Sequence, residues 1–189
     1  MVMRFMTGFL RIGSRYYKDY QLVLSGICGG LICCGYLCDM SHIALTYHLV
    51  FSTYRRQHVI NQEHERELYK YMHDLSKKHD VLVRRIGGMP DHVHMLCDIP
   101  AKIAVSEFVK LLKTETSKFM RVNPHFSKWL GWSEGYGGFT IDASLREARK
   151  IYIMNQREHH SRIKFEDEYR NLLNEAGFSS DTAILGADD

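Results

Sequence analysis

The chain has 189 residues, of which 45% are hydrophobic and 12% aromatic. This length and composition allow one hydrophobic core of ordinary size and exclude wholesale disorder. The formal net charge is +3, but residues 1–39 hold 4 of the 25 basic groups and 2 of the 22 acidic ones, so the rest of the chain carries only +1. Net charge alone therefore gives little support for nucleic-acid binding, which must be argued from a site.

The first 39 residues do not share the pattern of the rest. An uncharged run at 22–38 follows four basic residues and has the look of a signal peptide or membrane anchor, but it is only 17 residues long and contains four glycines. We interpret 1–39 as an extension outside the folded domain, with Met40 as the natural start, and expect no membrane span in 40–178. Four of the five cysteines lie in the run. We interpret the fifth, Cys97, as a small buried residue of a reducing compartment.

Periodic apolar residues predict the first elements. Alternation from 43 to 51 is typical of a strand with one buried face. Apolar residues at 68, 71, 72 and 75 have helical spacing, which predicts an amphipathic helix over about 62–79. A second strand over about 81–86 meets the segment 87–91, whose sequence GGMPD we interpret as a tight turn into a third strand, 92–99. The second and third strands then form a hairpin.

The second half of the chain is mainly helical by the same criteria. A helix is outlined around 108–119, and the glycine-rich segment 135–142 predicts a short strand. Ser144 and Glu147 have the spacing of a capping box, which predicts a helix from Ser144 to about His160. A last amphipathic helix at 165–176, ended by Gly177, precedes a loose tail at 179–189. The order β α β β α β followed by α α predicts an α+β fold, a ferredoxin-like sandwich whose antiparallel sheet has helices on one face, plus C-terminal helices.

Two histidines on the third strand are candidate metal ligands. His92 and His94 lie two residues apart, so both imidazoles leave the same face of the strand, while Val93, Met95 and Cys97 point into the core. Two neutral imidazoles in this arrangement can converge on one metal ion. The pair is also compatible with strand histidines that bind nothing, so a second element is needed.

Tyr152 and Gln156 provide that element. They lie four residues apart on the predicted helix, hence on one face with Cβ atoms about 5–6 Å apart; the alternative is a packed tyrosine and a solvated glutamine. His159 and His160 follow about one turn later. They could contact phosphate, hydrogen-bond to the direct ligands of the metal, or, as cations, stabilise the C-terminal end of the helix. Tyr136 is a rival nucleophile, but it sits among glycines with no neighbouring ligand, which favours a structural or base-stacking role.

Taken together, these segments resemble a known family. PDHVHML at 90–96, GYGGF at 135–139 and YIMNQ at 152–156 are similar to the single-tyrosine transposases of the HUH endonuclease superfamily. These transposases serve the smallest bacterial insertion sequences and include relatives associated with repetitive extragenic palindromes. The similarity covers about residues 40–178, and the extension at 1–39 departs from the usual start of the family.

The resemblance implies a mechanism. Tyr152 would be the nucleophile, and His92, His94 and Gln156 would hold a divalent metal, Mg²⁺ or Mn²⁺. The enzyme would cleave single-stranded DNA near a hairpin, keep the 5′ end as a phosphotyrosine and release a 3′-hydroxyl. A homodimer with shared active sites, in the cytoplasm and associated with the nucleoid, is expected. A tyrosine of pKa near 10 is only about 0.1% ionised at pH 7, so metal assistance suits this chemistry.

Binding to DNA also needs cations. The best candidates for contacts with phosphate are seven basic residues, although a solvated face explains each of them singly: Arg55, Arg56, Arg84, Arg85, Lys110, Lys113 and Lys118. Two other functions stay open. One is a domesticated relative that binds hairpin DNA without cutting it, against which the retention of all four site residues argues. The other is an unrelated metallohydrolase or structural metal site. Of the three functions, only that of an active transposase predicts a covalent protein–DNA adduct at Tyr152.

Overall fold

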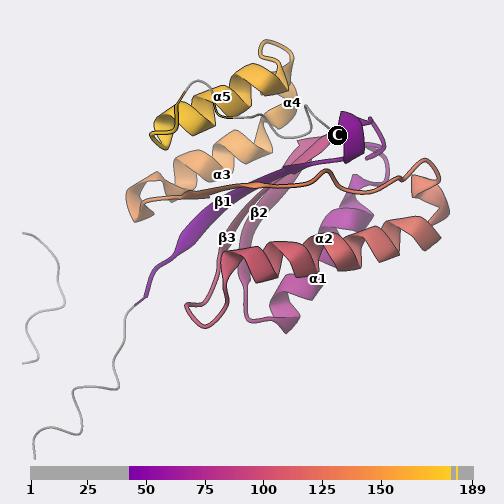
Figure 1. Cartoon of the computed structure of the whole chain (residues 1–189), viewed down its shortest axis with the longest axis horizontal. Helices are drawn as coiled ribbons and strands as arrows, with labels where there is room; N and C mark the ends of the chain where they lie inside the picture. The colour runs from indigo at the N-terminus through magenta and orange to yellow at the C-terminus, as the bar shows by residue number, and fades with distance from the viewer. Residues whose placement is uncertain (1–42, 180–181, 183–189) are drawn as a thin grey trace, which may run out of the picture. The chain divides into compact units, whose positions relative to one another are not determined.

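The computed structural model describes residues 43–179 and 182. Its main elements follow the predicted order of strands and helices (Figure 1): β1 (Thr46–Ser52), α1 (Glu65–Lys78), β2 (Leu82–Met89), β3 (His92–Asp98), α2 (Val105–Val122), β4 (Gly137–Thr140), α3 (Arg146–Met154), α4 (Gln156–His160) and α5 (Phe165–Glu175). The predicted extension at 1–39, the start at Met40 and most of the predicted tail at 179–189 lie outside the described residues. Among the residues that are described, no helix has both the length and the apolar composition needed to cross a membrane.

The four strands form one antiparallel sheet in the order β2-β3-β1-β4. The central pair, β1 and β3, is in register with Leu49 opposite Met95 and Val50 opposite His94. This strand order, with α1 and α2 on one face, is the ferredoxin-like arrangement, so the predicted α+β class is confirmed.

The face under α1 and α2 holds the main hydrophobic core. Both helices are amphipathic and place Leu68 and Leu112, among others, against the sheet. Val93, Met95 and Cys97 of β3 point into this core, as their alternation predicted. Burial raises the pKa of the Cys97 thiol to about 12, so this cysteine is a small core residue, not a reactive thiol.

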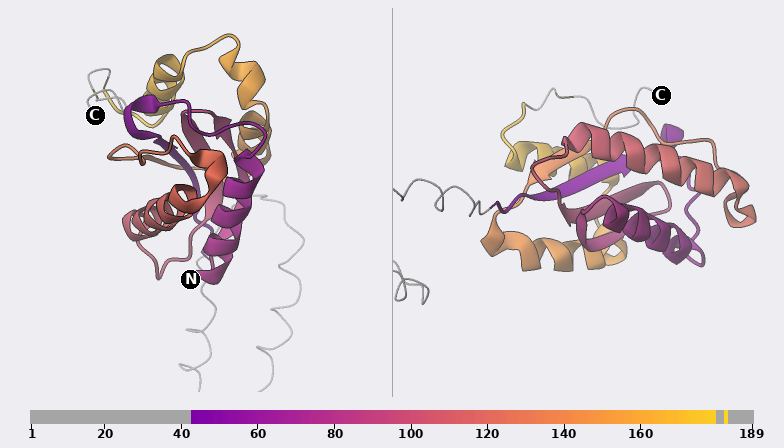
Figure 2. Two further views of the ribbon diagram at one scale, coloured as in Figure 1. Left: turned by 90° about the vertical axis from the view of Figure 1, so that its right-hand side faces the viewer. Right: turned by 90° about the horizontal axis from the view of Figure 1, so that it is seen from below.

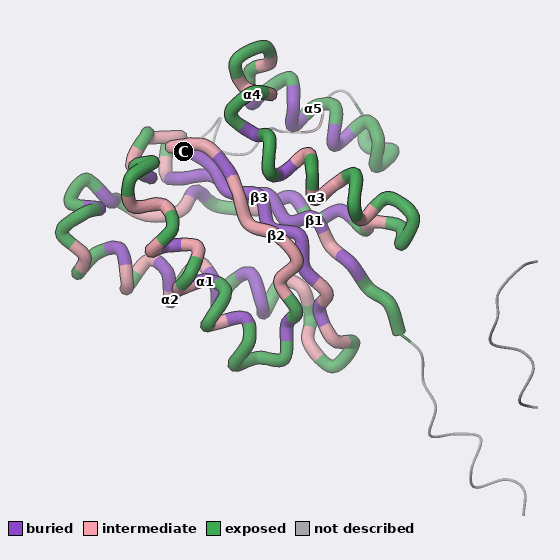
Figure 3. Tube along the Cα trace, turned by 180° about the vertical axis from the view of Figure 1, so that it is seen from behind, coloured by how far each residue is buried: buried purple, intermediate pink, exposed green. Residues whose placement is uncertain are grey.

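The opposite face is covered by α3, α4 and α5, whose position the sequence left open (Figures 1 and 2). A second apolar cluster joins Val50 and Phe139 of the sheet to Phe165, Tyr169 and Leu172 of α5. Because both faces are covered, the central strands are buried on both sides (Figure 3). The prediction of one buried face for the first strand is therefore wrong: all residues from 48 to 52 are buried.

The boundaries of the first strand also differ from the prediction. β1 begins at Thr46, and its pairing with β3 ends where Thr46 meets Asp98. Ile43 and Leu45 precede this pair and are 59% and 38% exposed. They continue the apolar alternation in the sequence, but no strand residue lies opposite them.

Gly87 and Gly88 belong to β2 and not to the predicted turn, since the strand runs on to Met89. They permit close packing. A Cβ atom on Gly87 would lie 2.5 Å from the carbonyl oxygen of Ile153 in α3, and one on Gly88 would lie 2.2 Å from the carbonyl oxygen of His92. Glycine in a strand often marks such an approach of a second backbone, and here it brings α3 directly onto the hairpin.

The predicted capping box at Ser144 and Glu147 is wrong. The Asp142 side chain accepts a hydrogen bond of 2.8 Å from the backbone nitrogen of Ser144, and a short 3₁₀ turn from Ala143 to Leu145 precedes α3. The predicted single helix from 144 to 160 is also two helices, α3 and α4, separated at Asn155. In contrast, α5 and Gly177, which has a φ of 81°, confirm the predicted last helix and its glycine end.

Candidate metal centre and tyrosine site

His92 and His94 extend from β3 toward the helices α3, α4 and α5. They are only 1% and 0% exposed, because the second helical layer covers this face. Their neighbours on the adjacent strand are Ser52 and Val50. The two-residue spacing therefore places both imidazoles on one face, as predicted, and the tertiary structure buries them there.

Each of the two imidazoles is oriented through its Nδ1 atom. The carboxylate of Asp91 lies 2.8 Å from Nδ1 of His92, and Nε2 of His48 lies 2.9 Å from Nδ1 of His94. The rings of His48 and His94 are stacked, with centroids 5.1 Å apart. A partner on the second ring nitrogen is the usual way in which proteins orient a metal-binding histidine. The Nε2 atoms of both residues are left to face the same space.

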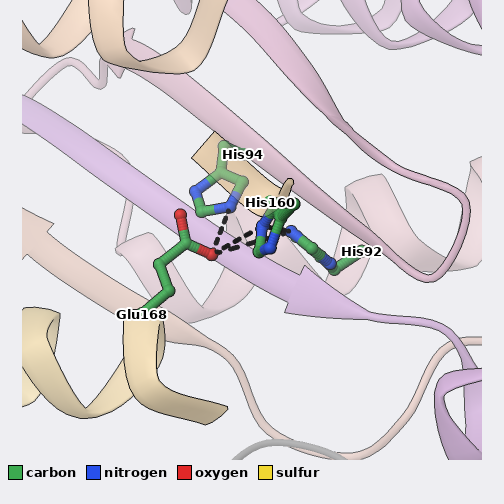
Figure 4. Close-up of side chains that lie close together, drawn as sticks. All are labelled: His92, His94, His160 and Glu168. Atoms are coloured by element: carbon green, nitrogen blue, oxygen red, sulfur yellow. Dashed lines mark hydrogen bonds and ion pairs between the residues drawn. The ribbon is translucent and has the colours of Figure 1, made fainter. Parts of the chain in front are cut away.

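Two residues of the C-terminal helices enter that space (Figure 4). Nε2 of His160, from α4, lies 3.1 Å from Nε2 of His92. Glu168, from α5, places Oε2 at 3.1 Å from Nε2 of His160, 3.5 Å from Nε2 of His94 and 3.8 Å from Nε2 of His92. One ligand atom from each of these four residues lies within 4.8 Å of all the others, which is a grouping suited to a metal ion.

Tyr152 lies beside this cluster in the same chain. Its hydroxyl donates a hydrogen bond to Oε1 of Glu168, and the amide of Gln156 donates a second one of 3.0 Å to the same oxygen. The guanidinium of Arg149 lies 5.2 Å from the centre of the tyrosine ring. Tyr152 and Gln156 thus meet at one carboxylate, although they belong to two helices.

The electrostatics of the cluster follow from its burial. Burial lowers the pKa of His92 to about 4 despite the hydrogen bond with Asp91, so this imidazole is neutral at pH 7. Burial, followed by the charge of Glu168, raises the pKa of Tyr152 above its usual value. For Glu168 itself, burial raises the pKa, but the electrostatic interactions with the neighbouring imidazoles of His160 and His94 outweigh it and hold the pKa below the usual range. A neutral phenol therefore faces an ionised carboxylate.

Several buried polar atoms in the cluster or next to it have no hydrogen-bond partner. They are Nε2 of His94, Oε1 of Gln156, Oε2 of Glu168 and Nε2 of His159. Unpaired buried polar atoms cost about 1–3 kcal/mol each. Since these are nitrogen and oxygen atoms that can bind a divalent cation, the residues fit a metal ion.

Two clefts reach Tyr152 from outside. One, of about 310 Å³, is lined by Tyr152, Arg149, Glu168 and neighbouring residues of α3 and α5. The other, of about 370 Å³, is lined by Tyr152, Asn155 and Arg162 among others. His159 lines both clefts. Tyr152 and Glu168 therefore lie where the buried cluster meets an opening that a substrate could enter.

The seven predicted phosphate-binding residues do not form one group, although Arg56 borders the site through Asp91, the partner of His92. Arg56 pairs with Asp91 and Glu166 and lies over the ring of Phe165, and Arg84 pairs with Asp98. The three lysines lie on α2, across the sheet: Lys110 is exposed, Lys113 donates to the carbonyl of Ser133, and Lys118 pairs with Glu115. Arg55 follows β1 in a short 3₁₀ turn, and Arg85 lies on β2 with its Nε atom buried.

Tyr136, the rival nucleophile, packs against the core beneath α1 and α2. Its position on the far side of the sheet gives it a structural role. Asp91, His48, Arg149 and Glu168 also belong to the site, although they were not predicted from the sequence. Glu168 had a detectable signal, because a carboxylate at the spacing of Phe165, Tyr169 and Leu172 lies on the apolar face of its helix.

Fold and site together define a class of protein: a ferredoxin-like domain in which a helical tyrosine meets a pair of strand histidines, as in the HUH-type tyrosine transposases. The model of the family described as IS200-like transposases matches residues 41–156, and the chain belongs to this family of DNA transposases.

Individual relatives agree with this assignment. The ISDra2 transposase TnpA of Deinococcus radiodurans is 29% identical over 119 residues, which cover 60% of this chain and 85% of the relative. The transposase of insertion sequence element IS200 of Salmonella typhimurium is 30% identical over 124 residues, covering 59% and 76%. A solved REP-associated tyrosine transposase bound to a REP hairpin covers 79% of this chain and 98% of its own, with 13% identity and a TM-score of 0.50. That last likeness concerns the fold alone.

Proposed function

We propose that this transposase cleaves and rejoins single-stranded DNA through a 5′-phosphotyrosine on Tyr152, with a divalent metal held by His92, His94 and Gln156. The observation that carries the proposal is the carboxylate of Glu168, which accepts the hydrogen bond of the Tyr152 hydroxyl and also faces the two histidines. Nucleophile and candidate ligands thus occupy one buried site. The catalytic domain would comprise residues 40–178.

The residues of the chain divide the chemistry between them. Because the raised pKa of Tyr152 keeps the phenol neutral before attack, the hydrogen bond to Glu168 orients the hydroxyl. As the phenol oxygen attacks the phosphorus atom, its proton passes to the Glu168 carboxylate; the bond to the 3′ oxygen breaks, this oxygen takes up a proton, and the DNA leaves with a free 3′-hydroxyl. The bound metal, Mg²⁺ or Mn²⁺, supplies charge stabilisation to the phosphate oxygens.

The phosphotyrosine explains why such an enzyme transposes DNA instead of hydrolysing it. The new bond between Tyr152 and phosphorus keeps the energy of the phosphodiester. A 3′-hydroxyl from another strand can therefore attack the same phosphorus atom and release the tyrosine.

We expect hairpin-containing single-stranded DNA as the substrate, consistent with the hairpin in the solved relative. The clefts beside Tyr152 give access to the site, and Arg149 and Arg162 line them. Each of these two cations lines a cleft together with the nucleophile, and the seven basic residues proposed above would contact further phosphates. A cytoplasmic, nucleoid-associated location follows from this substrate.

The test is incubation with a labelled hairpin single strand and Mn²⁺, followed by denaturing electrophoresis. The expected product is a protein–DNA adduct that survives denaturation and maps to Tyr152. Hairpin binding without an adduct would instead indicate a domesticated, non-cleaving relative. Hydrolysis without an adduct would indicate a metallohydrolase.

The assembly we propose is a homodimer that shares its active sites, as the resemblance implies. In the single chain, Tyr152 lies at the histidines of its own subunit, so sharing requires α3 to exchange between subunits. Mixing Tyr152→Phe subunits with subunits carrying His92→Ala and His94→Ala tests this. Recovery of cleavage in mixed dimers means shared sites, and no recovery despite proven subunit exchange means that each site forms within one subunit.

A further inference from the structure

We infer that His160 of α4 and Glu168 of α5 are metal ligands that complete the centre begun by His92 and His94, and that Glu168 at the same time positions Tyr152. This inference rests on the proposed function and deepens it. Both added ligands lie beyond residues 41–156, the part of the chain that the family model matches. The C-terminal helices would thus form half of the metal centre.

The pairing of His92 with His160 is the first observation. Nδ1 of His92 faces the Asp91 carboxylate at 2.8 Å, and Nδ1 of His160 faces the backbone carbonyl of Ile163 at 3.0 Å. Carboxylates and carbonyls only accept hydrogen bonds, so each Nδ1 carries the proton. In neutral rings both Nε2 atoms then bear lone pairs, and these atoms are 3.1 Å apart. Two buried lone pairs at this distance repel each other unless a proton or a metal ion lies between them.

The position of the Glu168 carboxylate is the second observation. Its Oε2 atom lies 3.1–3.8 Å from the Nε2 atoms of His160, His94 and His92. Metal–ligand bonds of about 2.1 Å place neighbouring ligand atoms about 3.0 Å apart in an octahedron and about 3.4 Å apart in a tetrahedron. Oε2 of Glu168 and Nε2 of His94 nevertheless have no hydrogen-bond partner. Their spacing matches the edges of a coordination sphere.

The other oxygen of Glu168 is the third observation. Oε1 accepts hydrogen bonds from Tyr152 and Gln156, while Oε2 faces the histidines. One buried carboxylate therefore links the nucleophile to the metal centre. Glu168 is 2% exposed, and it reaches this place because Phe165, Tyr169 and Leu172 anchor α5 on the sheet.

The ligand set also indicates which ions would bind. Three imidazoles and one carboxylate suit divalent transition ions such as Mn²⁺, Co²⁺ and Zn²⁺. Mg²⁺ prefers oxygen ligands and several waters. The centre should therefore bind Mn²⁺ much more tightly than Mg²⁺. With the amide oxygen of Gln156, which has no hydrogen-bond partner, as a fifth ligand, a six-coordinate ion keeps one position for a phosphate oxygen.

The test is a titration of the full, DNA-free chain with Mn²⁺, followed by calorimetry and electron paramagnetic resonance. Glu168→Gln keeps the size of the side chain and removes its charge, and we expect it to weaken Mn²⁺ binding by about tenfold or more. Asp167→Asn is the matched control, because it removes a charge from the adjacent, exposed position of the same helix. Its affinity for Mn²⁺ should equal that of the wild type. Equal affinity in Glu168→Gln would overturn the inference.

Counting the ligands of bound Co²⁺ by X-ray absorption provides an independent measurement. The wild type should show three imidazoles, and His160→Gln should show two. Two imidazoles in the wild type would mean that His160 and Glu168 form only a protonated ion pair, and this result decides the matter even if Glu168→Gln fails to fold. Strand cleavage by the wild type is measured in a separate experiment. If the ligand assignment fails, the proposed function still stands; if the wild type does not cleave DNA, the ligand assignment still stands.

Discussion

On the face covered by α1 and α2, β3 contributes Val93, Met95 and Cys97 to an apolar core. On the face covered by α3, α4 and α5, the alternate residues His92 and His94 are buried as completely, but polar groups surround them. The core face stabilises the fold through apolar burial, about 25 cal/mol per Å². The site face contains buried atoms without partners, which reduce stability until a cation or substrate binds. Because successive residues of β3 point to opposite faces of the sheet, one set of its side chains stabilises the fold and the other set contributes to the site.

The largest effect is expected on the site face. Tyr152→Phe should abolish strand cleavage and the covalent adduct, since it removes the attacking oxygen but keeps the ring. Denaturing gels measure the adduct, and gel-shift titration should show nearly unchanged hairpin binding. Tyr136→Phe, on the core face, is the control and should cleave normally. Cleavage by the Tyr152 variant would remove Tyr152 from the mechanism.

His94→Ala should reduce cleavage in Mn²⁺ to the level without metal, and His92→Ala should do the same. The metal-free variants should remain folded, because neither imidazole belongs to the apolar core. Circular dichroism and thermal melting without metal check the fold. A large fall in the melting temperature would show that these histidines serve the structure instead of the chemistry.

Met95→Ala, one residue from His94, makes the matched change on the core face. Deletion of this fully buried side chain should lower the free energy of unfolding by about 2–5 kcal/mol. Urea titration measures the loss. If His94→Ala destabilised the metal-free protein as much, the contrast between the two faces would fail.

Asp91→Asn tests the orientation of His92 from outside the cluster. The carboxylate holds Nδ1 of His92 at 2.8 Å, and loss of such a partner typically weakens metal binding about 10- to 100-fold. Calorimetry with Mn²⁺ measures the change. Because Asp91 also pairs with Arg56, Arg56→Gln is the control, and it should affect Mn²⁺ affinity less.

The smallest effect is expected from shortening the chain to begin at Met40. The periodic pattern starts after this residue, and both faces of the sheet are covered by helices from residues 65–175. The melting temperature and the rate of cleavage should therefore equal those of the full chain. A shortened protein that fails to fold would assign residues 1–39 a structural role.

The sequence alone was sufficient for the order of the elements and for much of the site. Periods of two and 3.6 residues specify which side chains share a face, and this predicted the common direction of His92 and His94 and the amphipathic character of α1, α2 and α5. It could not show that Gly87 and Gly88 remain in a strand, because close backbone packing is the cause: Ile153 of α3 lies against Gly87, and the backbone of β3 lies against Gly88. It also misplaced the helix start, because the side chain of Asp142 caps a 3₁₀ turn that precedes α3.

Only the tertiary structure could indicate the full composition of the proposed metal centre. His160 is 68 residues from His92 in the sequence, yet their Nε2 atoms are 3.1 Å apart, and Glu168 joins them because apolar residues of α5 bind the sheet. Local periodicity indicates which face of an element a residue occupies. Which elements meet at that face depends on packing between distant segments, and a buried carboxylate among histidines becomes visible only when those segments are in contact.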